Sequence, residues 1–231
     1  MSVLYIIATP IGNLGDISYR AVETLKAVDI VACEDTRTTI KLLNHLGIQV
    51  PLISCRAHNE RQAAQSIVAA LNAGKTIAYT SDAGTPALSD PGAVLVQSAS
   101  QAGHTVLPIP GVSAFSALLS VSGVQDKTII FEGFLSPKPG RRKARLDVLL
   151  AGGDAFVVYE SPFRICALLE DLAASAPERY SCLGREMTKV HEEYLRGSVA
   201  QILAQLRERP VMRGEFALLV SGYMKGQNKS S

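Results

Sequence analysis

Residues 74–103 read GKTIAYTSDAGTPALSDPGAVLVQSASQAG. A short apolar run at 76–80 is followed by a loop of small polar residues, and then by a helical pattern that ends at Gly103. Asp90 is a suitable N-cap and Pro91 suits a first helical position, so we expect the helix to begin at this pair. A strand, a polar loop and a helix in this order form the repeating unit of α/β proteins.

The same order recurs throughout the first half of the chain. Strands are expected at 3–9, 29–34, 51–54, 76–80 and 105–109, with helices at 18–28, 36–47, 59–74, 90–103 and 113–123. Such alternation predicts a parallel sheet covered by helices on both faces. After Gly123 the pattern changes, with strands at 129–134, 155–160, 181–188 and 215–222 and helices at 141–151, from 161 onward and at 198–208.

These patterns predict an α/β protein of two domains. Residues 1–122 would form a domain with a parallel sheet, and residues 123–231 a smaller domain with a mixed sheet. Apolar residues make up 47% of the 231 residues and charged residues 19%, a composition that argues against a disordered chain. The four cysteines are widely spaced without a CxxC pair, which favours reduced, structural thiols. No segment is long and apolar enough for a membrane span and no secretory leader is evident, so we expect a soluble, cytoplasmic protein.

Three loops rich in Pro, Gly and small hydroxyl residues follow the first, fourth and fifth predicted strands: 8–16, 80–92 and 108–114. In an open parallel sheet these loops meet at the carboxyl edge, where ligands bind, so they suggest a small-molecule cleft. Each loop alone is also explained as an ordinary β–α turn. The sequence contains no GxxxxGK[ST], GxGxxG or GxSxG motif, and the scattered His45, His58, His104 and His191 do not indicate a metal site.

Five stretches of the chain occur together in one known family: ATPIGNLGDIS (8–18), CEDTRTT (33–39), SDAGTPALSDPG (81–92), PIPGVSA (108–114) and YESPFRI (159–165). In this order they closely resemble the ribosomal small subunit methyltransferase I family, within the larger tetrapyrrole-methylase superfamily. The resemblance extends over about residues 3–221. Family members commonly continue well beyond the equivalent of EFALLVSGY (215–223), whereas this chain ends at Ser231.

The resemblance implies a two-domain class III methyltransferase fold with S-adenosyl-L-methionine folded in a cleft between the domains. It implies 2′-O-methylation of a decoding-centre cytidine in 16S rRNA, in the free rRNA or the 30S subunit, by a homodimer without a metal. Two alternatives stay open. The first is methylation of a small tetrapyrrole-like acid, and the second is a non-catalytic ribosome-assembly module that retains the cofactor site.

The cofactor positions of the superfamily can be transferred to this sequence one by one. They are Pro10, Asp82, Ala83, Gly84, Thr85, Leu88, Ser113 and Ala114 in the first half, and Glu160 and Met187 in the second. Glu160 departs from the family pattern, since many relatives have an apolar residue there. The neighbouring Ser161 is a candidate helix cap, so a purely structural role for this turn competes with cofactor binding.

Transfer of a methyl group to a ribose hydroxyl requires close positioning, and a base or a cation beside the acceptor oxygen would assist it. The candidates lie in CEDTR (33–37) and REMTK (185–189), and are Asp35, Arg37, Glu186 and Lys189. We favour Lys189, because residues i and i+2 of a strand face the same side and Met187 is a predicted cofactor contact. Its ammonium would stabilise an alkoxide, or burial would lower its pKa and make it a base. Alternatively, Glu34 and Asp35 cap the helix that begins at Thr36, and Arg37 pairs with one of them.

A basic run follows the predicted strand 129–134 and comprises Lys138, Arg141, Arg142, Lys143 and Arg145. Charge runs are usually solvated surfaces. An RNA substrate, however, requires phosphate contacts, and with the family resemblance in view RNA binding becomes the preferred interpretation.

Overall fold

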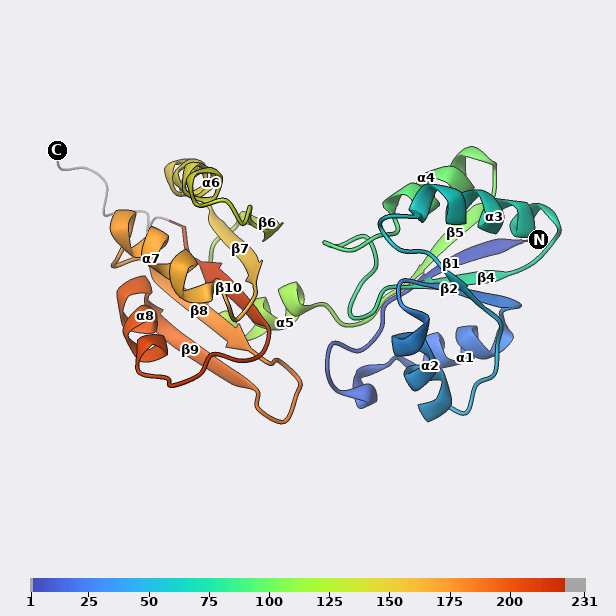
Figure 1. Cartoon of the computed structure of the whole chain (residues 1–231), viewed down its shortest axis with the longest axis horizontal. Coiled ribbons are helices and arrows are strands. Elements are labelled where there is room, and N and C mark those ends of the chain that lie inside the picture. Colours follow the sequence, from blue (N-terminus) through green and yellow to red (C-terminus); the bar gives the residue numbers. More distant parts are fainter. Residues whose placement is uncertain (1, 223–231) are drawn as a thin grey trace. The chain divides into compact units, whose positions relative to one another are not determined.

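The computed structural model describes residues 2–222. The chain divides into two compact units, Met1–Ser113 and Ala114–Ser231, and each is described by itself (Figure 1). The expected boundary at residue 123 differs from this division by the length of one helix, Ala114–Ser122.

The first unit contains a sheet of five strands in which every neighbouring pair is parallel. The order is β3-β2-β4-β1-β5, and the strands are β1 (Val3–Ile7), β2 (Ile30–Cys33), β3 (Leu52–Ser54), β4 (Ile77–Thr80) and β5 (Thr105–Ile109). This confirms the predicted parallel sheet. Because all strands point the same way, the loops that follow them lie at one edge.

Helices cover both faces of this sheet: α1 (Tyr19–Ala27) and α2 (Thr36–His45) on one face, and α3 (Glu60–Asn72) and α4 (Ala93–Gln101) on the other (Figure 1). A short 3₁₀ helix, η1 (Leu14–Asp16), follows β1. Successive strand residues point to opposite faces, so Leu4 and Ile77 join one apolar cluster with α3 and α4. Ile7 and Ala78 join the other cluster with α1 and α2.

The start of α4 is stabilised by a side chain from another helix. Glu60 in the first turn of α3 accepts hydrogen bonds at Oε1 from the backbone N–H groups of Gly92 (2.8 Å), Val94 (3.1 Å) and Leu95 (3.4 Å). Free N–H groups at a helix start require such acceptors. The expectation that Asp90 caps this helix was therefore wrong: the N-cap is Gly92, and α4 begins at Ala93.

The second unit has a mixed sheet of order β6-β7-β10-β8-β9, in which β6 and β7 pair in parallel and the other pairs are antiparallel. Its strands are β6 (Ile129–Phe134), β7 (Ala155–Glu160), β8 (Tyr180–Arg185), β9 (Glu193–Ser198) and β10 (Phe216–Val220). Strand β9 was not predicted, because its sequence EYLRGS is polar and contains a glycine. The predicted strand 181–188 ends early, at Arg185.

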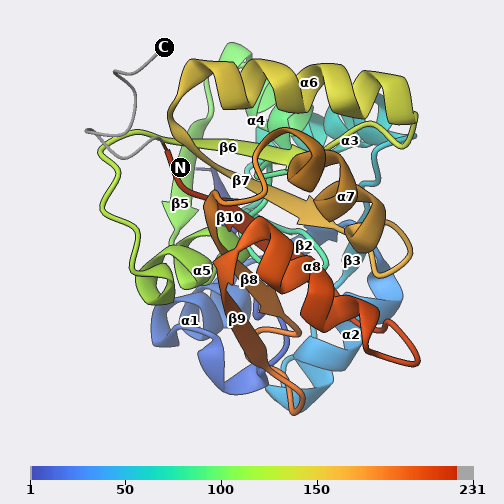
Figure 2. The same ribbon diagram turned by 90° about the vertical axis from the view of Figure 1, so that its left-hand side faces the viewer.

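Four helices accompany this second sheet: α5 (Ala114–Ser122), α6 (Pro139–Gly152), α7 (Ile165–Ser175) and α8 (Val199–Arg207) (Figure 2). Leucines of α6, α7 and α8 share one apolar cluster with Leu183 of β8. The next residue, Gly184, faces Leu118 of α5, so α5 covers the opposite face. The helix that we expected to close the first domain thus belongs to the second unit, where it contacts β8 and β10.

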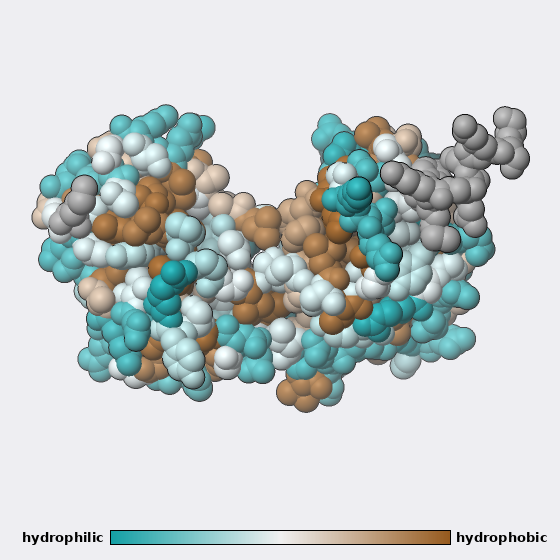
Figure 3. All heavy atoms as spheres, turned by 180° about the vertical axis from the view of Figure 1, so that it is seen from behind, coloured by the Kyte–Doolittle hydropathy of each residue, from teal (hydrophilic) through white to brown (hydrophobic). Residues whose placement is uncertain are grey.

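Several large apolar side chains stay exposed on the second unit, among them Phe134, Val148 and Phe163. Figure 3 shows hydrophobic residues among hydrophilic and neutral ones on the visible face of both units. Within the described residues, no helix is long and apolar enough to cross a membrane. All four cysteines are free, and three of them, Cys33, Cys55 and Cys182, are buried.

Candidate functional site

The loops after β1, β4 and β5 meet at the carboxyl edge of the first sheet. Thr9 and Gly84 form an antiparallel bridge in which each backbone N–H donates to the other residue's carbonyl oxygen at 2.9 Å. The hydroxyl of Thr85 donates to the carbonyl oxygen of Val112 (3.2 Å) and so links the second and third loops. The three loops picked out from their composition therefore form one connected structure.

The loop after β4 has an unusual backbone. Gly84 has a φ of +77°, and a Cβ atom there would lie 3.3 Å from Cγ2 of Ile11. Ala87 (φ 65°) and Ser89 (φ 71°) are also left-handed, although neither is glycine. Backbone of this kind is costly and tends to be kept at functional sites.

A cavity of about 290 Å³ lies between this edge and α2. Pro10 and Asp82, both predicted cofactor residues, line it. The cavity is also lined by three buried hydroxyl residues, Thr9, Thr39 and Ser81. The other predicted cofactor residues of the first unit have different surroundings. Ala83 is exposed, Leu88 is half-buried and Ser113 is buried.

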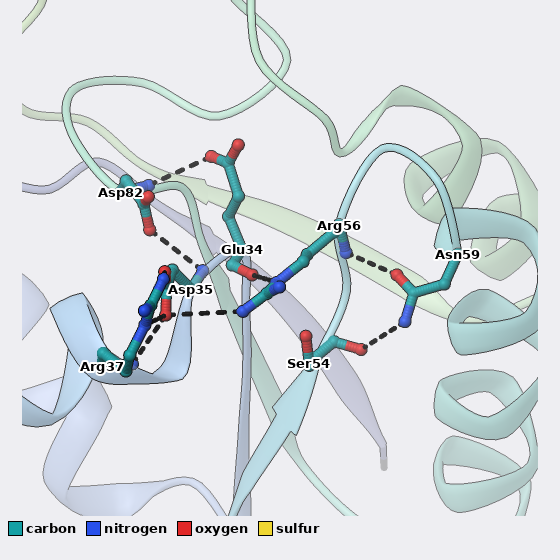
Figure 4. Close-up of polar contacts among 7 residues, drawn as sticks. All are labelled: Glu34, Asp35, Arg37, Ser54, Arg56, Asn59 and Asp82. Carbon is teal, nitrogen blue, oxygen red and sulfur yellow. Dashed lines mark hydrogen bonds and ion pairs between the residues drawn. The ribbon is translucent and has the colours of Figure 1, made fainter.

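Asp35 and Arg37 have the structural roles that we had ranked second (Figure 4). Asp35 is the N-cap of α2, where its carboxylate accepts the N–H of Arg37 (2.9 Å) and, at each oxygen, the Nε–H of the same residue (3.1 Å). The hydrogen bonds from the Arg37 side chain, and then that from its backbone, hold the pKa of Asp35 well below its usual range. Such a carboxylate is a poor proton acceptor, so Asp35 is not suited to act as a base.

Arg56 joins this cluster and was missed in the sequence. Its Nε–H donates to the carbonyl oxygen of Glu34 (3.1 Å), and its Nη2 lies 3.6 Å from Oδ1 of Asp35 (Figure 4). The side chain of Asn59 accepts the N–H of Arg56 (2.7 Å) and donates to the carbonyl oxygen of Ser54 (3.3 Å). The available signal was its place just after β3, at the same edge as the polar loops.

Three carboxyl groups near this edge are harder to ionise than usual. Burial is the main cause of the raised pKa of Glu34, Asp82 and Asp90, and each is raised further by neighbouring carboxylates. For Asp90 the pKa rises to about 6, although a hydrogen bond with Ser81 opposes the change. Asp82 also accepts the N–H of Asp35 (3.0 Å) at Oδ1, so the loop after β4 is tied to the start of α2.

In the second unit, Glu160 at the end of β7 is only 2% exposed. Its Oε1 accepts the N–H of Ser161 (2.7 Å) and pairs with Nη2 of Arg164 (2.7 Å). Its Oε2 is buried and has no hydrogen-bond partner among residues 2–222. Ser161 was a candidate cap, but α7 begins later, at Ile165, and Arg164 is its N-cap. The orphaned oxygen is the feature of this turn that helix capping does not explain.

Lys189 lies in the loop between β8 and β9 and not on a strand. The backbone is left-handed at Glu186 (φ 48°) and Thr188 (φ 66°), so the same-face argument that linked Lys189 to Met187 was wrong. The Nζ of Lys189 donates to Glu186 and to Glu215, at 2.9 Å each. Burial alone would lower the pKa of Lys189, but these hydrogen bonds outweigh burial and raise it. The two hydrogen bonds therefore favour the cationic form of Lys189, which suits charge stabilisation better than action as a base.

Met187 is 7% exposed and packs close to Gly184, where an added Cβ would lie 2.6 Å from its sulfur. Ala114, the remaining predicted cofactor residue, is the first residue of α5. Burial tends to raise the pKa of Glu186, but hydrogen bonds from Lys189 and from the N–H of Glu215 outweigh burial and lower it. Glu186 therefore serves as an ionised anchor for the loop.

The basic run divides into exposed and structural residues. Lys138, Arg141 and Lys143 are exposed at the start of α6. Arg142 is 5% exposed and donates from Nε to Asp171 (2.7 Å), so its assignment to an RNA surface was wrong. Arg145 forms a two-pronged pair with Glu132, with both hydrogen bonds at 2.7 Å. The spacing of α6, with Arg142 four residues before the buried Leu146, turns Arg142 inward.

Among residues 2–222 there is no group of three or more His, Cys, Asp or Glu side chains that is arranged to hold a metal ion.

Comparison with known proteins gives the family. Residues 3–203 match the tetrapyrrole (corrin/porphyrin) methylases. A protein of Borrelia garinii subsp. bavariensis named ribosomal RNA small subunit methyltransferase I is 44% identical over 95% of this chain and 98% of its own length. Proteins of the same name from Synechocystis sp. and Bacillus subtilis are 45% and 39% identical over 96% of this chain, and over 80% and 76% of their own lengths. The chain belongs to the ribosomal RNA small subunit methyltransferase I family of tetrapyrrole methylases.

A solved structure extends the comparison of the fold beyond this family. Uroporphyrin-III-C-methyltransferase from Thermus thermophilus superposes with a TM-score of 0.66, covering 96% of this chain and 94% of that one. Sequence identity is only 16%, so the similarity concerns the fold. It confirms the predicted tetrapyrrole-methylase fold, with a parallel first sheet and a mixed second sheet.

The raised pKa of Asp90 leads to a prediction about stability and pH. The carboxyl of Asp90 ionises less readily in the folded chain, so its contribution to stability is fully present below its unfolded pKa and is lost as the pH rises through about 6. The variant Asp90→Asn should therefore raise the urea midpoint at pH 8 and have little effect at pH 4. Asp147→Asn, on an exposed position of α6, serves as the control. Equal effects of Asp90→Asn at both pH values would contradict the prediction.

Proposed function

We propose that this chain is an S-adenosyl-L-methionine-dependent methyltransferase that modifies the ribose 2′-hydroxyl of a decoding-centre cytidine in 16S rRNA. The proposal is supported by one observation above others, the alignment of relatives named ribosomal RNA small subunit methyltransferase I along 95–96% of the chain. Its setting would be the cytoplasm, its substrate the free rRNA or the 30S subunit, and its active form a homodimer.

The first unit is suited to a cofactor of this kind. Gly84 is buried beside Ile11, and the Thr9 bridge holds its backbone in place. Glycine in such a loop lets the neighbouring chain approach an amino acid or ribose group closely. S-adenosylmethionine, when bound, supplies an electrophilic methyl group on a sulfonium that leaves as a neutral thioether. Pro10, Asp82, Ala83, Gly84, Thr85, Leu88 and Ser113 would hold it from this unit, and Ala114, Glu160 and Met187 are the proposed contacts from the second.

The chain's own contribution to the reaction is to position the acceptor and to stabilise charge. The hydroxyl oxygen must be held in line with the transferring methyl group, and positioning of this kind accounts for a large part of many rate enhancements. We keep Lys189 as the proposed cation for the developing alkoxide, because its ammonium is stabilised by two carboxylates. Its flanking partner Glu186 would orient it.

Methyl transfer to ribosomal subunits tests the function. The full chain is incubated with tritiated S-adenosylmethionine and 30S subunits that lack the modification, and the labelled nucleotide is mapped. Label on a decoding-centre cytidine ribose is the expected result. Label on a precorrin offered in parallel would favour the small-molecule alternative, and cofactor binding without any transfer would favour the ribosome-assembly module.

A substitution at Gly84 tests the cofactor loop. Gly84→Ala should weaken S-adenosylmethionine binding, because the added methyl group would lie 3.3 Å from Cγ2 of Ile11 and force the loop after β1 or the loop after β4 to shift. Gly74→Ala is the matched control, since Gly74 also has a positive φ (+86°) but no atom within 4 Å of an added Cβ. Both variants should lose about 1 kcal/mol of stability from the left-handed backbone. Calorimetry that finds the same cofactor affinity in both would remove this loop from the site.

The proposed role of Lys189 is tested by Lys189→Met, which keeps the length of the side chain and removes its charge. Single-turnover methyl transfer at saturating cofactor and RNA should fall by about 10²-fold, the usual loss for one charge-stabilising donor. The double variant Glu186→Gln and Glu215→Gln removes both carboxylate partners but keeps the lysine. If that double variant loses as much rate as Lys189→Met, the lysine only fastens its loop.

The exposed part of the basic run is tested through salt dependence. Replacing Lys138, Arg141 and Lys143 with Ala should weaken RNA binding, and should reduce the slope of log affinity against log salt by about one per lost phosphate contact. A variant with Arg20, Lys26 and Arg61 replaced, all exposed in the first unit, removes the same charge elsewhere. An unchanged slope in the α6 variant would identify the run as ordinary solvated surface.

Arg142→Ala should instead lower the unfolding free energy, since it leaves Asp171 without its partner.

A further inference from the structure

The cavity beside α2 is large enough for a single nucleoside, and it is lined by hydroxyl, carboxylate, basic and apolar side chains that could bind a nucleoside. We propose that it holds the target nucleoside of the RNA substrate, a pyrimidine whose exocyclic amino group is recognised by Asp82. The inference rests on the proposed function and names the acceptor subsite of that function. Its volume of about 290 Å³ is at the lower end of the usual range for ligand sites, ~300–1,000 Å³.

Hydroxyl groups line the inner wall of the cavity, and their protons are already donated to acceptors within the protein. Thr9 is 3% exposed and donates from Oγ1 to the carbonyl oxygen of Ser81 (3.3 Å). Ser81 is 2% exposed, and its hydroxyl proton is directed to the protein, where the carbonyl oxygen of Ala83 (3.3 Å) and the carboxyl of Asp90 are its acceptors. A hydroxyl that donates its proton to the protein keeps two lone pairs for a ligand. The wall therefore offers fixed acceptors, which suit the hydroxyl and amino donors of a nucleoside.

Apolar and charged groups complete the cavity. Leu14 of η1 is 41% exposed, and together with Pro10 and Leu42 it supplies an apolar surface for the face of a base. Lys41, exposed on α2, supplies a cation for a flanking phosphate. Asp82 uses Oδ1 to accept the N–H of Asp35, and its side chain is exposed, so that Oδ2 can accept a hydrogen bond from a ligand. Carboxylates recognise the amino group of cytosine in this way, and uracil has no such donor.

The position of the cavity distinguishes it from the predicted cofactor loop. It shares Pro10 and Asp82 with the predicted cofactor residues, whereas Gly84, Thr85, Leu88 and Ser113 do not line it. Methyl transfer requires the acceptor oxygen to lie beside the donor, so an adjoining site that shares a few residues is what the reaction needs. Its hydroxyl, carboxylate, cation and apolar groups are those used to hold a base removed from its stack.

Filling the cavity tests the inference. Thr38 lines the cavity from the exposed first turn of α2, and Thr38→Phe would occupy its space without entering the core. Ile40→Phe is the control, because Ile40 is 46% exposed on the same helix and does not line the cavity. Single-turnover transfer to 30S subunits should fall by about 10²-fold in Thr38→Phe and stay at the wild-type rate in the control. Calorimetric S-adenosylmethionine affinity should be unchanged in both variants.

Equal transfer rates in the two variants would overturn the inference. Loss of cofactor affinity in Thr38→Phe would also overturn it, since the cavity would then belong to the cofactor site. A wild-type chain that transfers no methyl group would refute the proposed function itself. Nucleotide binding is then the separate measurement: cytidine 5′-monophosphate should shift the amide signals of residues around the cavity in wild type and Ile40→Phe, and not in Thr38→Phe. Absence of those shifts in wild type would count against the cavity as a nucleoside site.

Asp82→Asn tests the recognition of the amino group with almost no change of shape. The amide oxygen can still accept the N–H of Asp35, while its NH₂ group replaces one acceptor by a donor. Wild type should bind cytidine monophosphate more tightly than uridine monophosphate. The variant should lose this preference, by about the tenfold or more that one base contact provides. A preference that survives the substitution would show that Asp82 does not read the base.

Discussion

Two backbone hydrogen bonds between Thr9 and Gly84 hold the working edge of the first unit together. The two residues are 75 positions apart in the sequence. Both bonds are formed by backbone atoms alone, so a glycine, which has no side chain, can form them as well as any other residue. The parallel sheet brings the loops to one edge, and the bridge determines how closely they approach. The cavity depends on this approach, because the loop after β1 supplies Thr9 and Pro10 to its lining and the loop after β4 supplies Ser81 and Asp82.

The carboxyl groups at this edge have different electrostatic surroundings. Arg37 and Arg56 lie close to Asp35, while Glu34 and Asp82 contact each other through the N–H of Asp82 (3.4 Å). Burial and mutual repulsion make the second pair reluctant to ionise. Groups held in such an environment are sensitive to an incoming donor, since a hydrogen bond from a ligand stabilises the charged form. The edge therefore combines a backbone joined by hydrogen bonds with carboxyl groups whose ionisation a bound ligand can change.

The fold of the first unit was predictable, and the reasons are local. Runs such as IVAC in β2 and IAYT in β4 show no alternation of apolar and polar residues, because both faces of the sheet are covered. Ser18 caps α1 as expected. In the second unit, α6 begins at Pro139, two residues before the expected start at 141. Strand β9 could not be recognised in the same way, since an edge strand with polar residues has no apolar periodicity to detect.

Pairings between distant residues account for most of what sequence reasoning missed at the site. The contacts between Glu60 and the start of α4, Arg142 and Asp171, and Arg56 and Glu34 join residues 22 to 35 positions apart. Spacing along the chain reveals none of them. The motif residues Pro10 and Asp82 were found because their loops are distinctive in composition, and Arg56 was missed because the turn after β3 is not. The prediction that Lys189 continues a strand failed at two left-handed residues, Glu186 and Thr188, that carry no glycine signal.

The carboxylate of Glu60 also influences hydrogen exchange at the end of the loop between β4 and α4. The amide protons of Gly92, Val94 and Leu95 are shielded by an oxygen that belongs to the first turn of α3. Their exchange with solvent deuterium thus requires the start of α3 to fray or the carboxylate to swing away, whatever the state of α4 itself. The loop between β4 and α4 is consequently fastened at its far end to a neighbouring helix. Hydrogen exchange at the start of α4 therefore reports on the start of α3 as well, where Glu60 lies 32 residues before Gly92.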